Sequence, residues 1–140
     1  MVAVDGSESS LDAADYAIEM AKMYKAQLTT LTVSHITMSS FGLAGLPDSI
    51  KQLKEKHILE SKQWFDKLNQ RAKQYDVQLT TELVDSQMSV DGTIAEYAES
   101  HGIDLIVLGT RGRSGFKKLL LGSVASGVVN YATCPVMVVK

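Results

Sequence analysis

The chain has 140 residues, of which 45% are hydrophobic and 21% charged, and its formal net charge is −2. This composition predicts one globular domain spanning residues 1–140 and excludes a largely disordered chain. The low net charge argues against general affinity for nucleic acid or membranes, and no apolar run approaches the roughly 18–20 residues of a membrane span. Because no signal peptide is visible, we expect a cytoplasmic protein with no nucleic-acid or membrane partner.

The N-terminal segment predicts a strand followed by a helix. Residues 1–4 are apolar, and the sequence Asp-Gly-Ser that follows is typical of a turn. Ser9 or Ser10 is expected to cap the helix, because serine oxygens accept hydrogen bonds from free N–H groups of the first turn. Apolar residues then recur at helical spacing as far as Tyr24, so this helix should bury one face.

The next segment predicts a second strand, a long connection and a long helix. Residues 27–35 are rich in Thr, Val and Leu, which favour strands. Residues 36–49 contain two glycines and a proline, and they could form a lid, a contact surface or merely a longer loop. An amphipathic helix is expected over 50–75, with one face that includes Leu53, Ile58, Phe65, Leu68 and Ala72.

The second half of the chain repeats the alternation of strand and helix. Residues 77–84 alternate apolar and polar side chains and predict a third strand. A helix is expected over 94–101, ended by Gly102, and the apolar run 105–108 predicts a buried fourth strand. Ser123 is expected to cap the last helix, and Val136–Val139 would form the fifth strand.

Five strands separated by helix-bearing connections predict an α/β fold. We expect a Rossmann-like open parallel five-stranded sheet in the order 3-2-1-4-5, with helices on both faces. Ligands of such sheets bind at the carboxyl ends of the strands, where the winding direction reverses. Asp5 and Gly109 follow the first and fourth strands, so they should meet at one crevice.

A glycine-rich segment with positive charge follows the fourth strand. Its sequence, Gly109-x2-Gly112-x9-Gly122-Ser123, ends where the last helix is expected to begin. From residue 105 onward the chain has five basic and no acidic residues, whereas the rest has nine basic and sixteen acidic residues. Glycine lets a backbone approach a ligand, and a helix N-terminus attracts anions, so this segment predicts a phosphate site.

Several other catalytic and cofactor motifs are missing. The chain contains no Gly-x4-Gly-Lys-Ser/Thr loop, no Gly-x-Gly-x-x-Gly fingerprint and no Gly-x-Ser-x-Gly elbow. The three histidines show no metal-ligand spacing, and a single cysteine excludes an internal disulfide. We therefore recognise no catalytic residue and no metal site in the sequence.

These residues resemble the universal stress protein family. The spacing Gly-x2-Gly-x9-Gly-Ser is similar to the motif of its ATP-binding members, and residues 2–7, 101–109 and 134–139 also resemble family segments. The resemblance covers nearly the whole chain. It implies the same layered α/β fold that the alternation of strands and helices predicts.

The resemblance also implies a nucleotide site. Asp5 is expected beside the adenosine, although a helix-capping role is an alternative. Gly112 would turn the loop toward the phosphates, with Arg111 and Arg113 as candidate phosphate neighbours. Ala3 and Val33 would line the adenine side. Leu108 and Gly109 would close over base and ribose. Gly122, Ser123 and Val124 would offer N–H groups and a hydroxyl to the phosphates.

The protein is predicted to bind ATP or AMP, with or without Mg²⁺. Its predicted role is that of a nucleotide-dependent regulatory or interaction module in the stress response. A slow ATP-hydrolysing enzyme and a nucleotide-independent dimeric interaction protein are the alternatives. The resemblance further implies a homodimer formed through the strand Val136–Val139. A terminal apolar strand at a sheet edge also favours such pairing on physical grounds.

Overall fold

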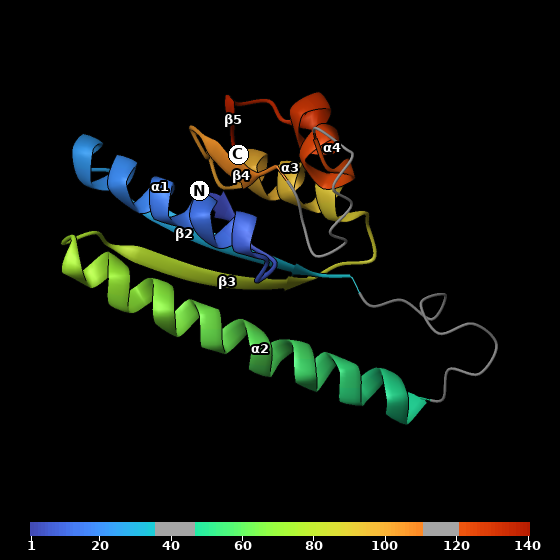
Figure 1. Cartoon of the computed structure of the whole chain (residues 1–140). Helices are drawn as coiled ribbons and strands as arrows, with labels where there is room; N and C mark the ends of the chain where they lie inside the picture. Colours follow the sequence, from blue (N-terminus) through green and yellow to red (C-terminus); the bar gives the residue numbers. More distant parts are fainter. Residues whose placement is uncertain (36–46, 111–120) are drawn as a thin grey trace.

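The computed structural model describes residues 1–35, 47–110 and 121–140 (Figure 1). Five strands form one parallel sheet in the order β3-β2-β1-β4-β5, which confirms the predicted fold and strand order. The central strand, β1, has only two residues. The strands are β1 (Val2–Ala3), β2 (Leu28–Ser34), β3 (Leu79–Asp85), β4 (Ile106–Gly109) and β5 (Val136–Val139).

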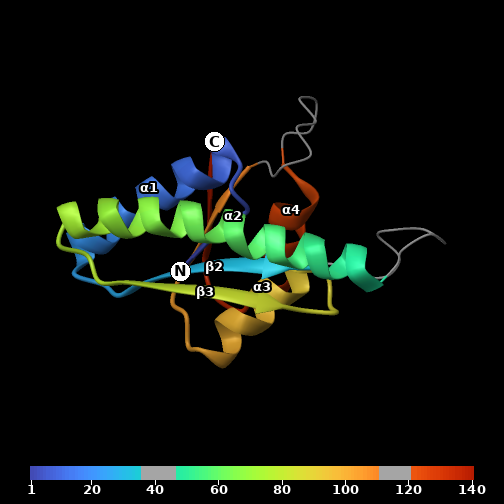
Figure 2. The same cartoon turned by 90° about the horizontal axis from the view of Figure 1, so that it is seen from below.

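Helices cover both faces of the sheet, as predicted. α1 and α2 bury their apolar side chains with one core cluster, and α3 and α4 bury theirs with the other. Figure 2 shows α1 and α2 on one side of β2 and β3, and α3 on the opposite side. None of the helices in the described ranges is long and apolar enough to cross a membrane. The helices are α1 (Glu8–Tyr24), α2 (Pro47–Gln74), α3 (Val90–Ser100) and α4 (Ser123–Tyr131).

The central strand β1 is paired on both sides. Val2 pairs with Thr30 of β2 on one side and with Val107 of β4 on the other. Because successive strand residues point to opposite faces, Val107 belongs to the core under α1 and α2, whereas Ile106 and Leu108 belong to the core under α3 and α4. β4 is thus buried on both faces, which explains its uninterrupted apolar sequence.

Two predicted helix caps differ from the structure. α1 is capped by Ser7, whose Oγ accepts from the N–H of Ser10 at 3.3 Å, so the prediction of Ser9 or Ser10 is wrong. Gly6 adopts φ +80° and turns the chain early enough for the helix to begin at Glu8. At α4 the N-cap is Gly122, and Ser123 is the first helical residue instead of the cap.

α2 and α3 both begin before their predicted first residues. α2 begins at Pro47, and proline suits the first helical position because its fixed φ and missing N–H cost nothing there. α3 begins at Val90, after Ser89 accepts a hydrogen bond from the N–H of Gly92 at 3.3 Å. Gly102 follows the end of α3 with φ +60°, the left-handed conformation that suits a helix stop.

Candidate functional site

A cavity of about 280 Å³ lies at the carboxyl ends of the central strands. We call it the carboxyl-edge cavity. Its walls come from β1, β2 and β4 and from the first turns of α1, α3 and α4, so residues from both ends of the chain meet there. The described residues that line it are Ala3, Val4, Asp5, Ser10, Leu31, Val33, Val90, Ile94, Leu108, Thr110, Gly122, Ser123, Val124 and Ala125.

Asp5 is held at the rim of this cavity by the start of α1. Its Oδ1 accepts from the N–H of Ser7 at 3.1 Å and from the Oγ–H of Ser7 at 2.6 Å. The N–H of Asp5 donates to Ser10 Oγ at 3.3 Å, and Ser10 Oγ–H donates to the carbonyl of Ser7 at 2.9 Å. Asp5 therefore supports the capping residue of α1 and also faces the cavity, so the two roles predicted for it are compatible.

The predicted apolar wall is brought together on the sheet. Ala3, Val33 and Leu108 lie on three neighbouring strands and all line the cavity. Leu31 joins them because it lies two residues before Val33 and so points to the same face. Together these side chains form a smooth apolar surface that suits the face of an aromatic ring.

The N-terminus of α4 forms the opposite wall, but its first donor is already used. Gly122 N–H donates to the carbonyl of Thr110 at 2.7 Å, so Gly122 differs from the expectation that it offers this group to a phosphate. Ser126 N–H makes the bond to Gly122 O that begins the helical ladder. The N–H groups of Ser123 and Val124 therefore precede the ladder of α4 and lie at the positive end of its dipole.

Other predicted residues lie apart from the lining or outside the described residues. Gly109 ends β4 opposite Val139, and a Cβ added to it would lie 2.5 Å from the carbonyl oxygen of Ser9. The side of Gly109 on which a side chain would lie therefore faces α1, and Gly109 is not among the residues that line the cavity. Arg111, Gly112 and Arg113 belong to the segment that the structure does not describe.

Sequence reasoning missed several lining residues. Ser10 was read only as a possible helix cap, although its position one turn after Asp5 brings it back to the same strand end. Val90 and Ile94 share one face of α3 because they are four residues apart, which would have been recognisable had the start of α3 been placed correctly. Thr110 and Ala125 carry no local signal, because only the tertiary fold brings them to the cavity.

The charge and shape of the cavity define what it can hold. Asp5 is the only ionisable side chain among its described lining residues. No group of three or more His, Cys, Asp or Glu in the described ranges is arranged to hold a metal ion. An apolar wall, one carboxylate and a helix N-terminus suit a ligand that combines a ring, hydroxyl groups and an anion.

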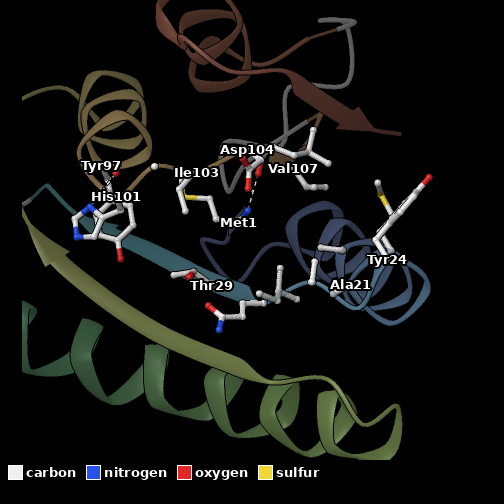
Figure 3. Close-up of a pocket in the computed structure, with 16 residues that line it drawn as sticks. Met1, Ala21, Tyr24, Thr29, Tyr97, His101, Ile103, Asp104 and Val107 are labelled. Carbon is white, nitrogen blue, oxygen red and sulfur yellow. Dashed lines mark hydrogen bonds between the residues drawn. The ribbon is translucent and has the colours of Figure 1, made fainter.

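A larger cavity of about 520 Å³ lies at the opposite, amino edge of the sheet (Figure 3). Leu28 and Thr29 of β2 line this cavity together with Met1 and Leu105, whose amino group and carbonyl form a hydrogen bond of 2.6 Å. His101 stacks on Tyr97 at its rim, with ring centroids 3.8 Å apart. Among the described residues this amino-edge cavity has no helix N-terminus in its lining, and parallel sheets bind ligands at their carboxyl ends, so the smaller cavity is the candidate site.

The sheet order defines a Rossmann-like α/β protein, and its candidate site, the carboxyl-edge cavity, lies at the point where the winding reverses. The chain belongs to the universal stress protein family, whose sequence model matches residues 1–140. A universal stress protein of Methanocaldococcus jannaschii is 37% identical over 142 residues, which cover all of this chain and 80% of that relative.

Solved structures agree with this assignment. The universal stress protein UspA from Lactobacillus plantarum has a TM-score of 0.79 at 29% identity, over 99% of this chain and 96% of its own. A universal stress protein in complex with cAMP has a TM-score of 0.73 at 27% identity, over 99% and 94% of the two chains. A family protein from Arabidopsis thaliana with AMP bound shares the fold, with a TM-score of 0.69 at 16% identity over 99% and 90%.

Proposed function

We propose that this protein binds an adenine nucleotide, ATP or AMP, in the carboxyl-edge cavity. The observation that carries the proposal is the meeting of Asp5, the apolar wall on β1, β2 and β4, and the N-terminus of α4 around one cavity. Its volume of about 280 Å³ is close to the lower end of the range for small-molecule sites, roughly 300–1,000 Å³.

Each part of a nucleotide has a matching part of the cavity. The adenine ring would pack on Ala3, Val33 and Leu108, and Asp5 would accept hydrogen bonds from the ribose hydroxyls. The phosphates would approach the N–H groups of Ser123 and Val124, where the helix dipole favours negative charge. Mg²⁺, when present, would bind mainly to the phosphates and to water.

The complexes of family relatives with cAMP and AMP support this ligand class. We infer a regulatory or interaction module whose nucleotide changes its conformation or its partners, in which turnover of the nucleotide is not required. A phosphate-release assay on the ATP-bound protein separates this role from slow hydrolysis.

A homodimer through β5 completes the proposal. β5 is an edge strand of the sheet and exposes Met137, and the neighbouring helix α4 also exposes apolar side chains. An apolar edge strand next to an apolar helix surface favours pairing with a second copy. The exposed large apolar residues on these two elements are Val124, Val129, Tyr131 and Met137.

Isothermal titration calorimetry with ATP, AMP and cAMP tests the proposed site. We expect saturable binding of one nucleotide per chain. Asp5→Asn should raise the Kd about ten-fold, because a hydrogen bond to a charged group contributes roughly 1.5–3 kcal/mol.

The matched control is His101→Ala, which changes the amino-edge cavity and leaves the carboxyl-edge cavity intact. It should bind nucleotide like the wild type. If His101→Ala binds nucleotide more weakly and Asp5→Asn binds it unchanged, the nucleotide binds in the amino-edge cavity and not in the carboxyl-edge cavity. A wild-type protein that binds none of the three nucleotides would refute the proposed function.

A further inference from the structure

Trp64 of α2 lies directly behind the Asp5 wall of the carboxyl-edge cavity, although α2 contributes none of the described lining residues. Gly6, the residue after Asp5, has φ +80°. A Cβ added to Gly6 would lie 2.5 Å from Cζ3 and 2.6 Å from Cε3 of Trp64. The six-membered ring of the indole therefore lies against the backbone of the turn that presents Asp5.

The polar edge of the same indole connects to the end of β1. Trp64 Nε1–H points to Thr32 Oγ1 at 3.4 Å, and Thr32 Oγ1–H donates to the carbonyl of Val4 at 3.0 Å. Thr32 is buried, and the N–H of Val4 donates to Leu31 O at 2.9 Å. Trp64 thus contacts the residue after Asp5 directly and reaches the residue before it through one hydroxyl.

These contacts restrain a part of the turn that α1 does not hold. The hydrogen bonds from α1 fix Asp5 and Ser7, which lie on either side of Gly6. Glycine has the largest conformational freedom of any residue, and a left-handed glycine can move its neighbours when nothing packs on it. The indole ring removes that freedom from the side of α2.

We propose that Trp64 is a positioning residue for the nucleotide: by restraining Gly6 it keeps the Asp5 carboxylate aimed into the cavity. This inference rests on the proposed nucleotide-binding function. It assigns to α2, which contributes none of the described lining residues, an influence on affinity that acts through Gly6 and Asp5. Trp64 is also the only tryptophan of the chain, so its fluorescence reports on this contact.

The test compares ATP affinity and stability in the same samples of wild type, Trp64→Leu and Trp64→Phe. Trp64→Leu removes both the ring and the N–H, and its Kd should rise roughly ten-fold, as expected when one charge-assisted hydrogen bond is lost. Trp64→Phe keeps a ring against Gly6 and loses only the N–H, so its Kd should rise about three-fold.

Leu68→Ala is the matched control, because Leu68 is buried one turn further along the same face of α2. It should lower stability in urea and leave the Kd for ATP unchanged. Unchanged ATP affinity in folded Trp64→Leu would overturn the positioning role, as would an equal loss of affinity in Leu68→Ala.

The remaining outcomes are also decisive. If Trp64→Leu does not fold, unchanged affinity in Trp64→Phe overturns the inference, and a raised Kd supports it. Absence of ATP binding by the wild type refutes the proposed function itself, and with it this role. Binding by the wild type with no effect at Trp64 refutes only the positioning role.

Discussion

At the scale of single residues, Gly109 shows how the end of a strand can be shaped by a neighbouring helix. The position that a side chain would occupy is filled by the backbone and hydroxyl oxygens of Ser9, both 2.5 Å from an added Cβ. Real Cβ atoms do not approach backbone so closely. Glycine at this position therefore allows the first turn of α1 to lie on β4, next to the rim of the cavity.

Gly109→Ala should destabilise the protein by about 1–3 kcal/mol, because the start of α1 must move away from β4. Urea unfolding followed by circular dichroism measures this loss. Gly92→Ala is the control, since its added Cβ meets only side-chain atoms, at 3.0 and 3.4 Å, and alanine favours the helix. Equal stability of Gly109→Ala and wild type would contradict the close contact.

At the scale of elements, α2 is longer than the sheet that it covers. Its 28 residues span about 42 Å, whereas the seven residues of β3 span about 23 Å. Figure 1 shows the N-terminal part of α2 beyond the carboxyl end of β3. Phe65 and Leu68 are buried accordingly, but Leu53 and Ile58, predicted for the same face, are 40% and 42% exposed.

Leu68→Ala and Leu53→Ala should therefore differ strongly in stability. Leu68 is 4% exposed, and removing its buried side chain should cost about 2–5 kcal/mol of unfolding free energy. Leu53→Ala should cost less than about 1 kcal/mol, because water already reaches that side chain. Urea denaturation of both variants measures the two values, and similar losses would contradict the described burial of α2.

Patterns within an element were sufficient to predict most of the fold, whereas contacts between distant elements were not. The alternation of strand and helix predicted a parallel sheet, the common order of such sheets matches the observed one, and the apolar run Val136–Val139 coincides with β5. Three serines within four residues could not identify the cap, because Gly6 decides where α1 begins. The bond from Gly122 to Thr110 depends on how a whole connection closes, and no local pattern contains that information.

The residues of the candidate site were predictable from sequence to about the same extent as the fold. Asp5 and Ser123 follow from turn and helix-start patterns, and the parallel sheet brings both to one edge. Helical periodicity indicates which face of α2 is apolar, but it does not indicate how far the sheet extends beneath that face. The contact between Trp64 and Gly6 therefore required the tertiary structure.

At the scale of the whole molecule, β5 is the edge at which the proposed dimer would form. Ile106 N–H donates to Pro135 O, and Thr110 N–H donates to Val139 O. In a parallel ladder alternate residues point their backbone groups to opposite sides. The backbone groups of Val136 and Val138 therefore point away from β4, toward the side on which a strand of a second copy would pair.

Met137→Lys should convert the proposed dimer into a monomer, because a charge on an edge strand opposes pairing. Size-exclusion chromatography with light scattering measures the mass of each variant. Met23→Lys is the control, since Met23 is 75% exposed on α1 and lies outside β5. A wild-type monomer, or a Met137→Lys variant that remains dimeric, would refute the proposed interface.

β1 cannot meet both of its neighbours until most of the chain is available. Val2 pairs with Thr30 on one side and with Val107, more than a hundred residues later, on the other. During synthesis β2 and β3 can pair early, whereas β4 emerges late, and long-range pairing is slow. The carboxyl-edge cavity takes its walls from both groups of strands, so a nucleotide bound there would favour the completely formed sheet over every partly folded form. The supply of nucleotide would then influence what fraction of the protein is native.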